Sequence, residues 1–173
     1  MKDEILEIVD ANDNVIGKGL RSEILREGKV VRVVNIFLLN SKKEILLPKR
    51  SMNRKLFPGR YDFSCGEHVI PRENYYDAAV RGLKEELGIS NVQLKLLGKL
   101  GPNKTEGVFM QVYLGLCEYE LLNYDKKGID SFEWLTCKEI LNRFETHPES
   151  FKPHYGIVLK EFLKILLDPK SIT

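Results

Sequence analysis

The segment from Tyr75 to Leu87 constrains this chain most, because its residues repeat with the period of an α-helix. Its apolar residues recur three or four positions apart and predict one buried stripe, made of Ala79, Val80, Leu83 and Leu87. Arg81 lies four positions before Glu85, so Glu85 and Glu86 are expected side by side, one turn beyond the arginine. Gly88 follows Leu87 as a helix stop.

Glu85 and Glu86 are an adjacent carboxylate pair, which is a candidate site for a hard divalent cation. Magnesium takes few oxygen ligands from protein and shares its remaining positions with water and substrate phosphates. A lone pair of glutamates on a helix is most often solvated acidic surface. Here the pair occurs with Arg81 and with Glu73, a carboxylate just ahead of the helix where it favours the positive end of the dipole. This combination favours a metal site.

The spacing resembles the Nudix box, G-x5-E-x7-R-E-U-x-E-E-x-G-U, in which U is apolar. Seven positions agree with that pattern: Glu73, Arg81, Leu83, Glu85, Glu86, Gly88 and Ile89. Two positions depart from it. Glu67 stands where the box has its first glycine, with Gly66 one residue early, and Gly82 stands where the box has a glutamate after the arginine.

The resemblance implies hydrolysis of a diphosphate with magnesium or manganese, which would polarise the phosphates and activate a water molecule. It implies that Glu85 and Glu86 are catalytic metal ligands, and that a backbone carbonyl of Gly66 or Glu67 is a further ligand. Many family members draw another acid from a later loop or strand. By sequence Glu106 is best placed for that role, with Glu118 and Glu120 behind it, although each alone is more often a surface glutamate.

The resemblance also implies that Glu73 and Arg81 pair and hold the loop against the helix, with Gly88 completing the structural box. A basic loop precedes this helix and supplies candidate phosphate contacts: Arg50, Arg54, Lys55 and Arg60. Surface charge is the usual explanation of such a cluster. Cations are nevertheless needed for the phosphate oxygens that a metal leaves uncovered, which favours substrate binding.

The run from Arg50 to Gly66 resembles the Nudix branch that contains isopentenyl-diphosphate isomerase, and Cys65 with His68 resembles the Cys-Gly-His run of that enzyme. Two observations oppose isomerase activity. The inserted Glu67 displaces His68, and the stretch 21–34 has none of the histidines that the isomerase carries there. A lone cysteine at a strand end is more often a small buried hydrophobe.

Gly82 motivates a third interpretation, a diphosphate-binding module with weak or lost turnover. Glycine inside a helix costs about 1 kcal/mol relative to alanine. A neighbour packed against position 82 would explain the residue structurally. In the functional interpretation the metal site lacks one carboxylate, which Glu67 could return from the loop side.

Apart from this helix, the sequence predicts an α/β chain. The expected elements are a hairpin over 4–20, a short helical turn over 22–28, strands over 29–39, 44–50, 61–64, 92–100, 108–116 and 129–135, a turn-rich loop over 101–107, and helices over 137–145 and 155–167. Pro48 is expected to mark the end of its strand or an edge position of the sheet. The resemblance implies a Nudix-type α/β/α sandwich around a mixed β-sheet, as a single domain over 1–173 with residues 1–28 as an N-terminal hairpin extension.

Composition excludes several other classes of protein. The formal net charge of +2 gives no argument for a nucleic acid polymer, and no apolar run is long enough to span a membrane. Three widely spaced cysteines and an acidic N-terminal segment fit the cytoplasm. The expected partner is a small-molecule diphosphate of unidentified structure, and a homodimer is left open.

Overall fold

The computed structural model describes residues 3–105, 107–117 and 123–168. The elements follow in the order β1 (Ile5–Val9), β2 (Val15–Leu20), α1 (Arg21–Arg26), β3 (Val31–Leu39), β4 (Glu44–Arg50), β5 (Cys65–His68), α2 (Tyr75–Leu87), β6 (Leu94–Leu100), α3 (Pro102–Thr105), β7 (Val108–Leu116), β8 (Ile129–Thr136), α4 (Cys137–Thr146), the 3-10 turn η1 (Pro148–Ser150), α5 (Tyr155–Glu161) and α6 (Leu163–Leu167). Among the described residues, none of these helices is long and apolar enough to cross a membrane.

β3 lies at the centre of a six-stranded mixed sheet, in the order β6-β7-β3-β4-β8 with β5 also paired to β3. It runs parallel to β7 from Val31 opposite Val108 to Leu39 opposite Leu116, and antiparallel to β5. Its β-branched and apolar residues suit this position, because a strand covered on both faces needs apolar side chains on both.

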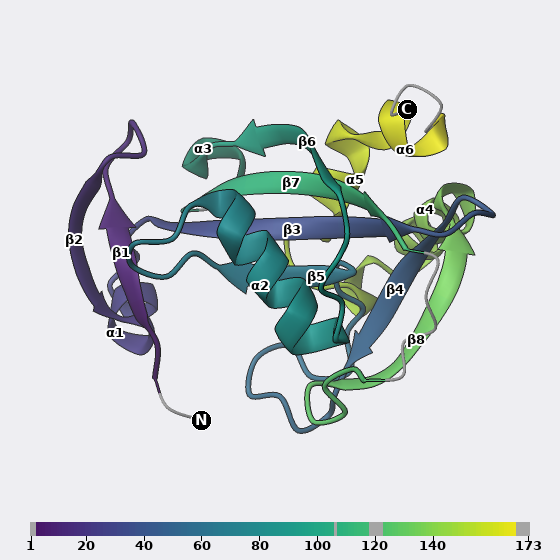
Figure 1. The fold of residues 1–173 in the computed structure, drawn as a ribbon, viewed down its shortest axis with the longest axis horizontal. Coiled ribbons are helices and arrows are strands. Elements are labelled where there is room, and N and C mark those ends of the chain that lie inside the picture. Colours follow the sequence, from purple (N-terminus) through teal and green to yellow (C-terminus); the bar gives the residue numbers. More distant parts are fainter. Residues whose placement is uncertain (1–2, 106, 118–122, 169–173) are drawn as a thin grey trace.

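Helices cover both faces of the sheet, which confirms the expected α/β/α sandwich (Figure 1). Successive side chains of a strand point to opposite faces. Phe37 and Leu39 of β3 therefore join a core with residues of α4, α5 and α6. Ile36 and Leu38 join a second core with Ala79 and other buried residues of α2. In α2, Ala78 is fully buried and Val80 is only half-buried, so the buried stripe is shifted from the expected one.

The N-terminal hairpin forms a separate two-stranded sheet at one end of the molecule (Figure 1), as expected. Its turn residue Asp13 attaches it to the main sheet. Arg32 Nε donates to Asp13 Oδ1 over 2.6 Å, Tyr75 Oη donates to Oδ2 over 2.9 Å, and Lys99 pairs with the same carboxylate. The hairpin is thereby joined to β3, β6 and the first residue of α2.

β4 and β5 both pair with β3, but along different parts of it. β5 pairs with β3 between Val33 and Ile36, whereas β4 pairs with β3 only where Leu39 faces Ile45. The expected strand over 61–64 was wrong: Tyr61 makes isolated bridges only, and β5 begins at Cys65. Pro48 lies inside β4 opposite Phe132 of β8, so it does not end its strand. The alternative expectation, an edge position, agrees with the pairing of β4 to β3 at Ile45 only.

Three helical predictions need correction. The segment after the hairpin is a six-residue helix, α1, with Ile24 buried at its centre. The loop over 101–107 contains α3. The expected C-terminal helix is broken at Phe162 into α5 and α6, because the φ of −103° and ψ of 10° at Phe162 are not helical.

Candidate active site

Helix α2 carries the predicted carboxylates Glu85 and Glu86, and both of its ends are capped. Asn74 Oδ1 accepts a hydrogen bond from the backbone N of Asp77 over 2.9 Å. Gly88 adopts a φ of 70°, and its backbone N donates to Lys84 O, which ends the helix in the left-handed conformation that glycine permits. The predicted role of Gly88 as a helix stop is therefore seen in the geometry.

Arg81 is the centre of an ion-pair network. Its guanidinium donates to both carboxylate oxygens of Glu73, over 2.9 and 3.1 Å, and to the carbonyl oxygen of His68 over 2.8 Å. It also contacts Glu67 over 3.2 Å and Glu85 over 3.3 Å. The pairing expected for Glu73 and Arg81 is present, and the same arginine reaches two candidate metal ligands.

Glu67 occupies the space above Gly82. A Cβ built on Gly82 would lie 3.3 Å from Glu67 Cβ and 2.9 Å from Cys65 Sγ, and it would overlap Glu67 Cγ. Strand alternation places Cys65 and Glu67 on the face of β5 that α2 covers. The structural explanation of Gly82 is thus visible, because Cβ and Cγ of Glu67 and Sγ of Cys65 fill the space that a side chain at position 82 would need.

Glu86 is the most strongly perturbed carboxylate of the site. Burial and the nearby charges of Glu67 and Asp62 raise its pKa to about 7, while a hydrogen bond from the Cys65 thiol acts in the opposite direction. Burial also raises the pKa of Glu67, although Arg81 partly offsets this effect. Carboxylates that are costly to ionise in isolation suit a site that gains a divalent cation.

The donor set fits magnesium or manganese bound together with substrate. Among residues 3–105, 107–117 and 123–168, no three Asp, Glu, His or Cys side chains converge closely enough to hold a metal alone. Glu85 is more exposed than Glu86 and is turned towards Arg81. Magnesium shares its coordination sphere with water and phosphate oxygens, so two carboxylates and a backbone carbonyl of Gly66 or Glu67 would suffice.

The four predicted phosphate contacts differ in their surroundings. Arg50 donates to Asp62 over 2.7 Å and to the carbonyls of Leu56 and Phe57, so it mainly holds its own loop. Arg54 reaches Asp125 over 3.3 Å and lies 4.0 Å from Glu86. A small cleft is lined by Pro48, Arg50, Arg54, Asp62, Phe63, Glu86, Gly128 and Ile129.

The other two basic residues lie away from this cleft's lining. Arg60 stacks on the ring of Phe57 and donates to Phe151 O over 3.4 Å. Lys55 is exposed. Arg54 is therefore the predicted cation that the structure brings nearest to the acidic helix.

Asp62 belongs to this site and was not singled out from the sequence. It is 8% exposed and accepts from Arg50, from Lys152 over 3.3 Å and from the backbone N of Phe63. The sequence signal that could have indicated Asp62 is its acidic charge, which stands within the basic segment that resembles the isomerase branch. Its burial depends on β4 and residues 151–152, which are distant in sequence.

Cys65 is buried and His68 is half-buried. Cys65 is 1% exposed, and burial with the charge of Glu86 raises the pKa of its thiol well above the usual range. Burial and the charges of Arg21, Lys152 and Arg81 lower the pKa of His68 to about 3. The imidazole is therefore neutral. Glu106, Glu118 and Glu120 lie outside the described residues, so their predicted role has no structural description.

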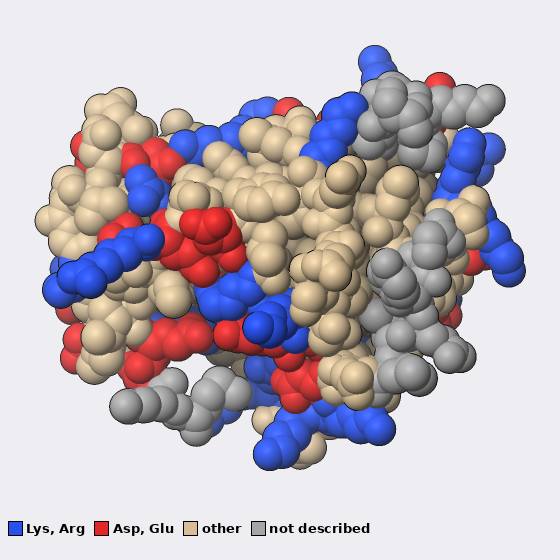
Figure 2. All heavy atoms as spheres, viewed as in Figure 1, with Lys and Arg blue, Asp and Glu red and all other residues tan. Residues whose placement is uncertain are grey.

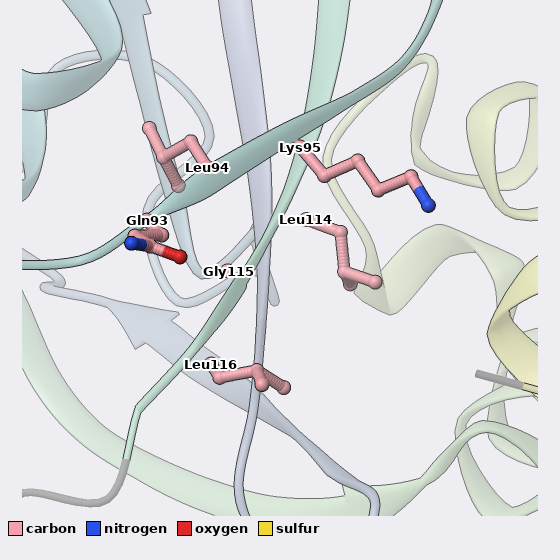
Figure 3. A pocket seen from close by; sticks show the side chains of 6 residues that line it. All are labelled: Gln93, Leu94, Lys95, Leu114, Gly115 and Leu116. Atoms are coloured by element: carbon pink, nitrogen blue, oxygen red, sulfur yellow. The ribbon is translucent and has the colours of Figure 1, made fainter. Parts of the chain in front are cut away.

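The charged residues of this face lie close together. Figure 2 shows acidic and basic side chains next to each other on the face that carries α2. A separate hollow lies between β6 and β7 and is lined by Gln93, Leu94, Lys95, Leu114, Gly115 and Leu116 (Figure 3). The described residues of its lining include no carboxylate, so they do not offer the donors that a metal and diphosphate require.

Comparison with known proteins identifies the family. The family model described as the NUDIX domain matches residues 29–155. The crystal structure of a Deinococcus radiodurans protein superposes with a TM-score of 0.83 and 32% identity, covering 91% of this chain and 98% of its own. The chain therefore belongs to the Nudix family.

Two curated relatives extend this result. An uncharacterized Nudix hydrolase of Nostoc sp. is 42% identical over 80% of this chain and 83% of its own length. A prenyl-diphosphate phosphatase of Methanosarcina mazei is 30% identical over 84% of this chain and 86% of its own. Further relatives named isopentenyl-diphosphate isomerase are 27 or 28% identical over most of the chain, which confirms the predicted branch.

Proposed function

We propose that this protein is a magnesium- or manganese-dependent hydrolase that cleaves the diphosphate linkage of a small organic molecule. The observation that carries the proposal is the position of Glu67 over Gly82, which supports the idea that its carboxylate replaces the one that the box lacks. The metal would polarise the phosphates and lower the pKa of an attacking water. Glu85 and Glu86 would hold it with the carbonyl of Gly66 or Glu67, and the Glu67 carboxylate, which pairs with Arg81, would lie beside them.

The chain's own residues supply the rest of the site. Glu86 has a pKa of about 7 in the metal-free protein, and a bound dication would lower it, so Glu86 is proposed as a ligand and Glu67 as a candidate for accepting the proton of the attacking water. Glu73 and Arg81 are proposed to hold the 69–74 loop against α2. Arg54 is proposed to contact a phosphate oxygen, with Arg50, Lys55 and Arg60 as further binding candidates. Glu106 stays a candidate for an additional acid.

The substrate is proposed to be a non-polymeric diphosphate. A relative named as a phosphatase of prenyl diphosphates favours hydrolysis of an organic diphosphate. The buried cysteines agree with a reducing cytoplasm as the place of the reaction.

The decisive experiment is a hydrolysis screen with magnesium or manganese across nucleotide sugars, dinucleotides, nucleoside triphosphates and prenyl diphosphates. Glu86→Gln should lower kcat by about 10²-fold or more, and Glu67→Gln by at least about 10-fold. Glu149→Gln is the matched control, since Glu149 is exposed and contacts only His147 among the ion pairs of the described residues. Wild-type rates in Glu86→Gln and Glu67→Gln would refute the assignment of the site.

Isomerase activity is the second candidate, because the Cys65 thiol donates a hydrogen bond to Glu86. The same assays should include interconversion of isopentenyl and dimethylallyl diphosphate by the wild-type protein and by Cys65→Ser. We expect no conversion, because Cys65 is buried beneath Glu67 and Glu86. Conversion that depends on Cys65 would replace the hydrolase proposal. Metal-dependent diphosphate binding without turnover of any substrate would instead identify a binding module.

A further inference from the structure

Lys152 lies far from the box in sequence, but the backbone fixes it beside the site. Tyr61 N donates to Ser150 O over 2.8 Å, and Lys152 N donates to Tyr61 O over 2.8 Å. These bonds make a parallel bridge between Tyr61 and Phe151. Residues 151–152 therefore run alongside the segment that leads through Asp62 into β5.

The ammonium group of Lys152 lies beside Asp62 and close to Gly66 at the start of β5. Its Nζ lies 3.3 Å from Asp62 Oδ2. It would also lie 3.7 Å from a Cβ built on Gly66. The side chain is 27% exposed, so it is anchored but accessible.

Asp62 cannot neutralise this lysine completely. Asp62 Oδ2 also accepts from Arg50 Nη1 over 2.7 Å, so two cations share one carboxylate. The charge of Lys152 also acts on Glu86 of α2 and on His68 of β5. The cluster of Asp62, Arg50 and Lys152 thus carries one excess positive charge next to the acidic helix.

We propose that Lys152 binds a phosphate group of the substrate diphosphate, and that Asp62 holds its ammonium group in place. This inference rests on the proposed hydrolase function. An ammonium group is a compact donor that suits phosphate oxygens not covered by a metal. Arg50 is largely committed to its own loop, which leaves Lys152 as the cation of this cluster with capacity for another acceptor.

The test compares wild type, Lys152→Met, Lys152→Arg and Lys104→Met. Methionine retains most of the side-chain length and removes the charge. Lys104→Met is the matched control, because Lys104 forms a comparable ion pair with Glu161 over 3.0 Å outside the site. Folding should be retained in Lys152→Met because Asp62 still pairs with Arg50, and thermal unfolding verifies this.

Inorganic pyrophosphate with magnesium is the binding probe, measured by isothermal titration calorimetry. Lys152→Met should weaken binding by at least about 10-fold. Lys152→Arg should recover part of that loss, and Lys104→Met should bind like wild type. In the hydrolysis assay, Lys152→Met should raise KM more than it lowers kcat, because the lysine holds phosphate in both the bound and transition states.

The failures of the two proposals are distinguishable. If wild type hydrolyses a diphosphate and Lys152→Met binds pyrophosphate as tightly as wild type, the role of Lys152 is overturned and the hydrolase proposal stands. If wild type neither binds pyrophosphate nor hydrolyses any diphosphate, both are overturned. If Lys152→Met unfolds at the assay temperature, pyrophosphate binding by Lys152→Met and Lys152→Arg is measured at a lower temperature. Equal affinities of these two variants would also overturn the role of Lys152.

Discussion

The side chain of Glu67 lies over the Cα of Gly82, so a larger residue at position 82 would clash with the glutamate at position 67. Any Cβ at position 82 would overlap Glu67 Cγ and approach Cys65 Sγ to 2.9 Å. The packing of Glu67 from the neighbouring strand therefore explains why position 82 of the helix is a glycine.

Gly82→Ala should destabilise the protein by about 1–3 kcal/mol, because overpacking outweighs the gain of about 1 kcal/mol in helix propensity. The Glu67 side chain cannot move cheaply, since Arg81 holds its carboxylate. Urea denaturation measures the change. The double variant Gly82→Ala with Glu67→Ala should lose less than the sum of the single changes. Strict additivity would show that the two side chains do not compete for space.

Glu86→Gln should raise the melting temperature of the metal-free protein while it lowers turnover. Glu86 is held near Glu67 and Asp62, and burial disfavours its charge. Removing that charge relieves repulsion, as is common where an active site trades stability for activity. Differential scanning calorimetry with chelator present tests this expectation. A lower melting temperature in Glu86→Gln would mean that its carboxylate is stabilising.

Arg81→Met should cost about 2–4 kcal/mol, because it leaves the partly buried Glu73 carboxylate without its two charge-assisted hydrogen bonds. The carbonyl of His68 also loses its donor. Chemical denaturation measures the loss. Arg143→Met is a useful comparison, since Arg143 makes a similar paired contact with the more exposed Glu133, and it should cost less than about 1 kcal/mol.

Asp13→Asn should weaken the attachment of the N-terminal hairpin, with a loss of about 1–2 kcal/mol near neutral pH. Burial opposes ionisation of Asp13, but hydrogen bonds from Lys99, Arg32 and Tyr75 outweigh it and lower the pKa below 3.8. A lowered pKa contributes stability above the unfolded-state value, and that contribution is lost as pH falls through the folded-state value.

Urea denaturation of wild type and Asp13→Asn from about pH 7 to about pH 3 tests this sign. The difference between the two proteins should shrink at the acidic end. If residues 1–173 form a single domain, as we propose, hairpin and core should unfold in one transition in wild type. A constant difference across the pH range would remove Asp13 as the source of the effect.

The sequence alone determined the family, the sheet's main strands, and both ends of α2. These features depend on local chemistry: the period of apolar residues, the glycine stop, and the fixed spacing of Glu73, Arg81, Glu85 and Glu86. The box pattern also singled out Glu67 and Gly82 as its two departures. It could not determine whether the Glu67 side chain contacts position 82, because that depends on how β5 packs against α2.

Tertiary structure alone decided the composition of the site around Glu86. Asp62 and Lys152 are 90 positions apart in sequence and meet because a parallel bridge joins Tyr61 to Phe151. Tertiary contacts also hold the Arg50 side chain at Asp62 and against its own loop, and they bury Cys65 away from solvent. Sequence periodicity reports which face of an element is buried. It does not report which distant side chain faces a given charge, because that is decided when strands and loops pack together.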